Sequence, residues 1–150
     1  MSVLSWGKCS IEHTSSKNGT PDSSYEPWDT PKSGTTKITA TAGTETTAEE
    51  EGGALVDVRT GKNTYQLEFD LFVKKGEARP IVDTDGVIEG EHAFRITPED
   101  PECTGALIER CTLRVEDSFS TEDGALLHYV ARCLKPATGN TVKEYVKGKS

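Results

Sequence analysis

The sequence has 150 residues, of which 33% are hydrophobic, and its formal net charge is −8 at pH 7. This length is typical of one domain with a core of its own, so we expect a single domain over residues 1–150. The acidic charge argues against a duplex-binding protein, because that binding requires a cationic surface. The sequence has no run of about 18 apolar residues that would predict a membrane-spanning helix, and its start does not resemble an export signal.

The N-terminal part divides into a short strand and a polar arm. Residues 3–14 contain strand-forming side chains and predict a strand. Residues 15–36 are rich in Ser, Gly, Pro, Asn and Asp, which predicts a long loop or an extended arm. Tyr25 and Trp28 are the only large apolar side chains there. Since long irregular segments are usually functional or disordered, we expect the arm to dock through these two rings.

The next segment is dominated by threonine. Residues 35–51 read TTKITATAGTETTAEEE, and threonine favours strands. Few large apolar side chains are present, so a strand pair formed here is marginal alone and better completed by another chain. The acidic run Glu49–Glu51 is followed by Gly52–Gly53, which predicts a turn, and residues 54–59 resume a strand.

The clearest strand covers residues 63–73. Its alternation over nine residues indicates an antiparallel sheet with one wet face; the apolar positions are Tyr65, Leu67, Phe69, Leu71 and Val73, and the polar ones are Gln66, Glu68 and Asp70. Residues 92–96 alternate in the same way. Together these patterns indicate a sheet whose buried face is continuous along each strand.

Residues 105–135 predict a hairpin. Even spacing places Leu107, Cys111, Leu113 and Val115 on one face of its first arm. The second arm, 125–134, is compatible with a helix by composition, but its place after a strand and a tight turn favours a strand. A final short strand and a basic tail are expected over 141–150. About seven or eight strands of this kind predict a sandwich or barrel.

Residues that carry chemistry are sparse. The four cysteines, at positions 9, 103, 111 and 133, form no close ligand pair and predict reduced, mostly buried thiols rather than a zinc site or disulfides. His13, His92 and His128 have no recognisable catalytic partners. Asp83–Gly86 predicts a turn and not a calcium loop, because the twelfth position holds Phe94. We therefore expect no catalytic residues, no cofactor and no metal.

Several segments in order resemble one protein family, the tail tube proteins of phages and prophages of Bacteroides-type bacteria. The resemblance covers nearly the whole chain and is carried by Trp6-Gly7-Lys8-Cys9, Thr30-Pro31, residues 35–41, Glu50-Glu51-Gly52-Gly53, Asn63-Thr64-Tyr65, Leu67-Glu68-Phe69, Asp85-Gly86-Val87, Pro98-Glu99-Asp100-Pro101, Asp123-Gly124 and Leu134-Lys135-Pro136.

The resemblance implies a mostly-β protein, an antiparallel sandwich or barrel with at most one short side helix, for which 76–82 and 99–109 are the best candidates. Such proteins assemble as hexameric rings that stack into a hollow tube for DNA, and related folds form the inner tube of type VI secretion systems. The implied partners are further copies of the chain, a tape measure protein and other tail proteins. DNA passes without specific binding, no membrane is involved, and the implied location is the virion tail, assembled in the bacterial cytoplasm.

In this family a loop or hairpin projects from the sandwich and contacts neighbouring subunits. The matching segment here is 35–56, and the self-association residues that it implies are Thr41, Thr44, Glu45, Thr46, Thr47, Glu49, Glu50, Glu51, Gly52 and Gly53.

Two other functions remain open at the level of sequence. A monomeric ligand- or carbohydrate-binding sandwich could use Trp6, Tyr25 and Trp28 as an aromatic platform, which requires the three rings on one rigid face. A small enzyme would need a polar pocket with coupled titratable groups, and no pattern in the sequence points to one.

Overall fold

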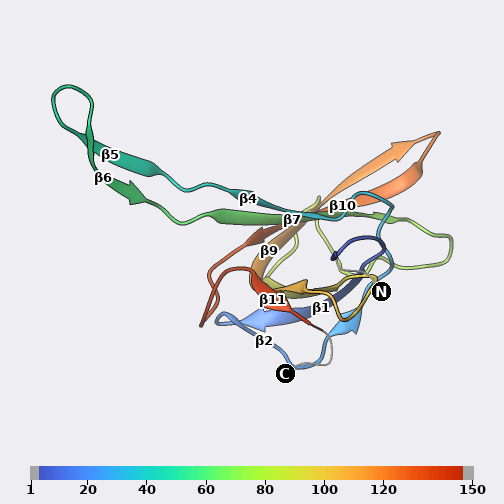
Figure 1. Ribbon diagram of the computed structural model, residues 1–150. Helices are drawn as coiled ribbons and strands as arrows, with labels where there is room; N and C mark the ends of the chain where they lie inside the picture. Colours follow the sequence, from blue (N-terminus) through green and yellow to red (C-terminus); the bar gives the residue numbers. More distant parts are fainter. Residues whose placement is uncertain (1–3, 147–150) are drawn as a thin grey trace.

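The computed structural model describes residues 4–146, and none of these residues is helical. The chain forms strands throughout (Figure 1). In chain order they are β1 (Ser10–Lys17), β2 (Thr20–Pro21), β3 (Glu26–Pro27), β4 (Lys37–Thr41), β5 (Glu45–Glu49), β6 (Leu55–Thr60), β7 (Thr64–Phe72), β8 (Glu91–Thr97), β9 (Gly105–Ser120), β10 (Gly124–Cys133) and β11 (Lys143–Tyr145).

Nine of these strands form one antiparallel sheet. Its order is β2-β1-β8-β9-β10-β7-β4, with β3 paired to β1 and β11 paired to β9. The sheet curls into a half-barrel, while β5 and β6 form a separate two-stranded sheet that projects from it (Figure 1). The mostly-β, antiparallel fold predicted from the sequence is thus confirmed.

Neither candidate segment for the side helix is helical. Residues 76–82 run irregularly, with Gly76 at a φ of 78° and Pro80 unable to donate a backbone hydrogen bond. In 99–109 a turn is followed by the start of β9, where Ala106 pairs with β8 and β11. In the second segment, the backbone groups of β9 are therefore hydrogen-bonded to neighbouring strands and do not need the internal hydrogen bonds of a helix.

The core lies on the inner face of the curled sheet. On β7, the predicted inward positions Leu67, Phe69 and Leu71 are at most 2% exposed, whereas Val73 lies beyond the strand and is 47% exposed. Strand β10 pairs with β7 on one side and β9 on the other, which confirms the prediction of a strand rather than a helix. Each large side chain buried here contributes about 1.5–3 kcal/mol of hydrophobic stabilisation.

A bulge in β9 changes one predicted core position. Phe94 pairs with Ile108 and His92 with Cys111, so two steps along β8 match three along β9. The additional residue rotates the strand locally. As a result Ile108 is fully buried, and Leu107, which even spacing predicts to point inward, is only half-buried.

The four cysteines are reduced thiols. Cys111 and Cys133 are buried and lie opposite each other on β9 and β10, whereas Cys9 and Cys103 are half-buried. Burial raises the pKa of the Cys133 thiol to about 11 and that of Cys111 well above its ordinary value. The two core thiols are therefore protonated, poor nucleophiles at neutral pH.

The first strand and the arm begin later than the sequence predicts. Residues 4–9 are irregular, because Gly7 adopts a left-handed φ of 89°, and β1 starts at Ser10. Strand β1 then continues to Lys17, since it pairs with β8 along its length. Residue 3 of the predicted strand and residues 147–150 of the predicted basic tail lie outside the described residues.

The arm docks on the protein's own core. Trp28 packs its ring against His13, Phe94 and Tyr129, with ring centroids 4.8, 5.3 and 5.3 Å away. The Trp28 N–H donates to the carbonyl of Ile11 at 2.9 Å, which holds the arm beside β1. The predicted docking of this aromatic residue therefore takes place within the chain, and the arm covers part of the half-barrel.

Candidate interaction surface

The β5–β6 hairpin stands away from the main sheet (Figure 1). Its strands pair from Glu45 with Thr60 to Glu49 with Leu55, and a bulge leaves Val56 as an additional residue on β6. Every residue of both strands is exposed. A two-stranded hairpin of this kind is at best marginally stable in water, so its extended shape is not explained by burial within this chain.

The hairpin turn uses the predicted pair of glycines. The Glu50 N–H donates to the carbonyl of Ala54 at 2.9 Å, and the Gly53 N–H donates to the carbonyl of Glu50 at 3.0 Å. Gly52 and Gly53 have φ values of 96° and 92°. Side chains rarely tolerate this left-handed region, which explains why glycine occupies both positions.

A glycine neck joins the hairpin to the main sheet. A Cβ atom on Gly43 would lie 2.4 Å from the carbonyl oxygen of Lys62. The Gly61 N–H donates to the carbonyl of Thr44 at 2.7 Å, while the ladder between β4 and β7 ends where Thr41 pairs with Thr64. The β4–β7 ladder ends and the β5–β6 ladder begins at this neck, where the two backbones approach so closely that only glycine fits.

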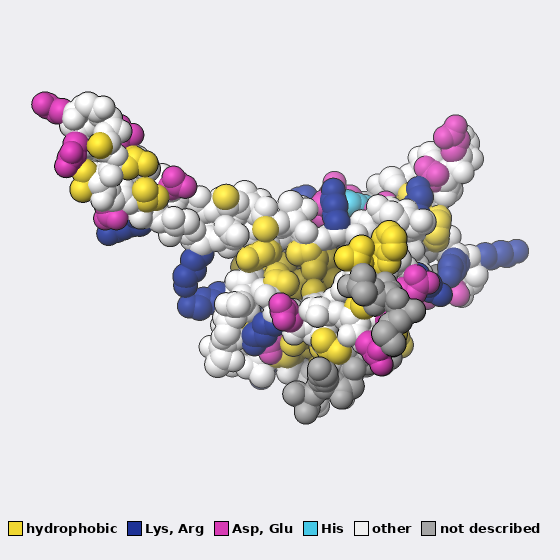
Figure 2. Space-filling model, viewed as in Figure 1, with side chains coloured by type: hydrophobic (Ala, Val, Ile, Leu, Met, Phe, Trp, Pro, Cys, Tyr) yellow, Lys and Arg dark blue, Asp and Glu magenta, His cyan; other side chains and the backbone are white. Residues whose placement is uncertain are grey.

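The surface of the hairpin combines apolar and acidic side chains. Leu55, Val56 and Val58 on β6 are 59%, 61% and 44% exposed. Between residues 45 and 59, five carboxylates and one arginine give a net charge of −4. Figure 2 shows the apolar side chains gathered within this acidic border. An exposed apolar patch rimmed by polar groups is typical of an interaction site.

All ten residues implied by the family resemblance lie on this projection or at its base. Thr41 ends β4, Thr44 lies in the neck, four more are on β5 and four are in the turn. The projection itself differs from the expected range 35–56. Residues 37–41 pair with β7 in the main sheet, whereas 57–60 belong to the hairpin.

The apolar residues of β6 are not among the site residues that the resemblance implies. Leu55 and Val56 lie inside the expected projection 35–56, whereas Val58 lies beyond it, and residues 54–59 predict only a strand. In the structure, β6 pairs only with β5 among the described strands. That these apolar side chains remain exposed is visible only once the strand pairing is known.

The three aromatic residues of the alternative platform do not gather on one face. The Tyr25 ring lies 4.1 Å from the Arg95 guanidinium, on the outer face of β8. Trp28 packs against Phe94, the next residue along β8 and therefore on the opposite face. Trp6 is 68% exposed in the irregular segment before β1.

Buried His92 and half-buried His13 form a pair next to Trp28. His92 Nε2 lies 3.0 Å from the carbonyl of Glu89 and must donate to it, so His92 Nδ1 accepts from His13 Nε2 at 3.0 Å. Burial, aided by the neighbouring His92, lowers the pKa of His13 to about 4. Burial also lowers the pKa of His92. The pair is therefore neutral near pH 7 and has a structural role in the sheet.

The third histidine lies on the outer face between two carboxylates. His128 Nδ1 is 2.5 Å from Asp70 Oδ1, and His128 Nε2 is 3.4 Å from Glu68 Oε1. Desolvation is the largest influence and acts to lower the pKa of His128, but the hydrogen bonds and charges of Asp70 and Glu68 outweigh it and raise the pKa. The imidazole is thus stabilised in its charged form.

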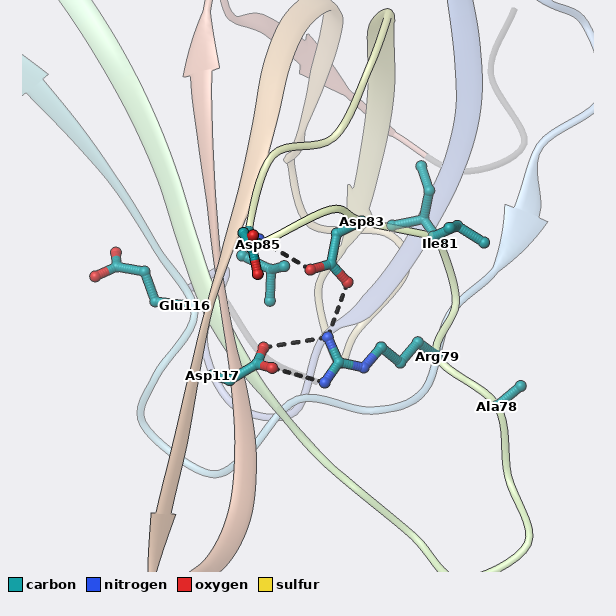
Figure 3. A pocket seen from close by; sticks show the side chains of 10 residues that line it. Ala78, Arg79, Ile81, Asp83, Asp85, Glu116 and Asp117 are labelled. Carbon is teal, nitrogen blue, oxygen red and sulfur yellow. Dashed lines mark hydrogen bonds and ion pairs between the residues drawn. The ribbon is translucent and has the colours of Figure 1, made fainter.

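A shallow pocket between the 78–86 loop and β9 contains several carboxylates (Figure 3). Arg79 occupies the middle, donating to Asp117 at 2.7 and 3.2 Å and to Asp83 at 2.8 Å. Asp83 also accepts the Gly86 N–H at 3.0 Å, which is the turn that the sequence predicts. The chain's own guanidinium therefore pairs with two of the four carboxylates that line the pocket and fastens the loop to β9.

Within the described part of the chain, no three His, Cys, Asp or Glu side chains are grouped so that they could hold a metal ion. Across residues 4–146, no helix is long and apolar enough to cross a membrane. No protein-family model matches the sequence, and no curated protein matches it. What the protein does must therefore be inferred from its residues and their arrangement.

Proposed function

We propose that this protein is a structural subunit of a phage or prophage tail tube, which assembles into stacked hexameric rings around a conduit for DNA. The observation that carries the proposal is the β5–β6 hairpin. Every residue of its two strands is exposed, three of them have large apolar side chains, and a glycine neck joins the hairpin to the body. Such an element gains stability only when another chain covers it.

Two further features support a self-associating role. The family resemblance of the sequence implies a projecting hairpin that contacts neighbouring subunits, and eight of the ten self-association residues that it implies lie on β5 or in the hairpin turn. The net charge of −8 also suits a conduit, because an acidic wall repels DNA and lets it pass without specific binding. Further copies of the chain, a tape measure protein and other tail proteins are the partners that this function requires.

A deletion tests whether the hairpin drives assembly. Residues 43–62 are replaced by Asn-Gly, a favoured two-residue turn, so that β4 and β7 still pair. We expect the circular dichroism spectrum to stay β-rich, because the buried core side chains lie outside the deletion. Sedimentation and electron microscopy should find rings or tubes with the full-length chain and monomers only with the deletion.

Point variants provide a matched comparison. Leu55→Ser combined with Val58→Ser removes two exposed apolar groups from the hairpin, and Val82→Ser removes one from a residue that is 88% exposed elsewhere. Assembly should weaken in the first variant and persist in the second. If the deletion variant assembles as readily as the full-length protein, or the full-length protein remains monomeric at every concentration and salt tested, the proposed function is wrong.

A further inference from the structure

An open pocket of about 450 Å³ lies beyond the end of the β7–β10 ladder. The ladder ends where Gln66 pairs with Arg132. The pocket is formed just past this pair, between residues 62–65 at the start of β7 and residues 135–142 after β10. No residue of β5 or β6 lines it, so the hairpin that carries the proposed function does not account for it.

Two lysines, Lys62 and Lys135, line the pocket, one from each of these segments. Neither takes part in an ion pair among the described residues. The chain has 25 acidic residues, but none of them lines this pocket, and residues 58–67 and 124–143 contain no Asp or Glu. The pocket is therefore cationic in an otherwise acidic protein.

The carboxylates of neighbouring elements do not pair with these two lysines. Glu109, on β9, is already paired with Lys143. Glu45, across the neck of the hairpin, forms no ion pair with Lys62 or Lys135. Both ammonium groups thus remain available to an anion from outside the chain.

The pocket also has neutral hydrogen-bond donors. Asn63 and Asn140 have amide groups and Thr141 has a hydroxyl, and none of these side chains has a hydrogen-bond partner among the described residues. The backbone N–H groups of residues 139–142 likewise donate to no described group. Gly139 has a left-handed φ of 82°, and free N–H groups in such a turn are a common element of anion sites.

This set of groups suits a phosphate better than a carboxylate. A phosphate group has close to two negative charges at pH 7 and three strong acceptor oxygens. The two charges match Lys62 and Lys135, and the oxygens match the neutral donors around them. Lysine binds phosphate as a point charge, without the planar geometry that arginine imposes. A carboxylate would balance only one of the two lysines.

One wall of the pocket is apolar. Tyr65 and Val142 are half-buried and pack against the hydrophobic core, which holds them in place. The pocket volume lies within the range of about 300–1,000 Å³ that is typical of small-molecule sites. The pocket therefore has room for an organic group beside the phosphate, in contact with this wall.

We propose that this pocket binds a phosphate group, which Lys62 and Lys135 hold by charge and the neutral donors hold by hydrogen bonds. The phosphate comes either from the free inorganic ion or from a small phosphate monoester whose organic part lies against the apolar wall. The site does not depend on self-assembly, so it goes beyond the proposed function.

Calorimetric titration of the full chain at constant ionic strength tests the proposal. The probes are inorganic phosphate, ribose 5-phosphate and ribose. We expect both phosphates to bind and ribose, which has no charge, not to bind. The amide chemical shifts of residues 62–65 and 139–142 should move on binding, which locates the ligand in this pocket.

Three double variants make the test specific. Lys62→Gln with Lys135→Gln should raise the dissociation constant about tenfold or more, because two charge-assisted contacts are lost. Lys62→Arg with Lys135→Arg keeps both charges and should bind more tightly than the glutamine variant. The matched control, Lys74→Gln with Lys75→Gln, removes the same charge from exposed positions beyond the other end of β7 and should bind like the unmodified protein. Circular dichroism checks that each variant is folded.

The probes also distinguish the two sources of phosphate. Tighter binding of ribose 5-phosphate than of inorganic phosphate assigns the site to a monoester, and otherwise the free ion is the ligand. If neither phosphate binds, if ribose binds as tightly as ribose 5-phosphate, or if the glutamine variant at positions 62 and 135 binds like the control, the proposal is wrong. The tube function is tested separately by assembly and does not depend on any of these results.

Discussion

His13 and His92 lie on the inner face of the sheet, and His128 lies on the outer face. The buried pair resists protonation because burial lowers both pKa values, that of His13 to about 4. Asp70 and Glu68 outweigh desolvation and raise the pKa of the outer histidine, which favours its charged form. The same residue type thus affects stability in opposite ways on the two faces of one sheet.

The two kinds of histidine site predict separate pH effects. Below pH 6.5 the unfolded chain binds protons at residues 13 and 92 that the folded protein excludes, so stability falls as pH falls, for His13 down to about pH 4. His128 stabilises fully below pH 6.5, and its contribution is lost as pH rises through its raised pKa. Urea unfolding measured across pH should show both slopes.

Single substitutions assign each slope to its residue. His13→Phe should flatten the dependence below pH 6.5 and leave the upper slope in place, since Trp28 and Phe94 already provide aromatic neighbours. His128→Asn should remove the upper slope and leave the dependence below pH 6.5 in place. An acid slope that is unchanged in His13→Phe would show that the buried pair does not control it.

At the scale of elements, the hairpin and the arm are two polar segments that differ in whether they pack against the core. The arm is rich in turn residues but carries Trp28, whose ring reaches the core. The hairpin has Leu55, Val56 and Val58, yet these side chains stay exposed and β6 pairs with β5 alone among the described strands. Local stability follows burial rather than the regularity of hydrogen bonding, so the irregular arm is anchored and the regular hairpin is not.

Amide exchange should reveal this difference. In the free subunit, amides of residues 45–60 are expected to exchange at rates close to those of an unfolded peptide, because the hairpin opens without loss of core contacts. Amides of β7 and β10 should exchange only through global unfolding. After assembly the hairpin should become protected, as measured by mass spectrometry. Strong protection of 45–60 in a dilute monomer would contradict the idea that a partner completes this element.

At the scale of the whole molecule, distant segments depend on one another. Trp28 packs on Phe69 of β7, Phe94 of β8 and Tyr129 of β10, and β1 pairs along its length with β8. Because so many contacts join residues far apart in sequence, the domain should unfold cooperatively and fold on the slow time scale of all-β proteins.

Removal of the Trp28 ring tests this interdependence. Trp28→Ala should lower the free energy of unfolding by about 2–4 kcal/mol, somewhat less than for a fully buried tryptophan because the ring is half-buried. The transition measured by circular dichroism should shift as one step, since the ring joins three strands. Trp6→Ala removes a ring that is 68% exposed and should change stability by less than about 0.5 kcal/mol. A Trp28→Ala midpoint equal to that of the native protein would mean that the arm is no part of the cooperative unit.

Much of the fold can be predicted from local pattern. Alternation in β7 identifies the strand and its buried face, because a half-buried strand needs period two whatever its neighbours are. The turn at Gly52–Gly53 is also predictable, since few residues other than glycine adopt its backbone conformation. The role of Gly43 was not, because the close approach that requires glycine involves Lys62, on the other strand of the neck.

For the candidate site too, one part can be predicted from the sequence and another part cannot. The sequence alone determines that residues 35–51 cannot bury a core of their own, since threonine and glutamate supply too little apolar surface. Only the tertiary structure decides that β6 leaves the sheet with its apolar residues exposed and that β9 bulges before Cys111. These facts depend on which strand pairs with which, and pairing joins residues through space at separations that no local pattern encodes.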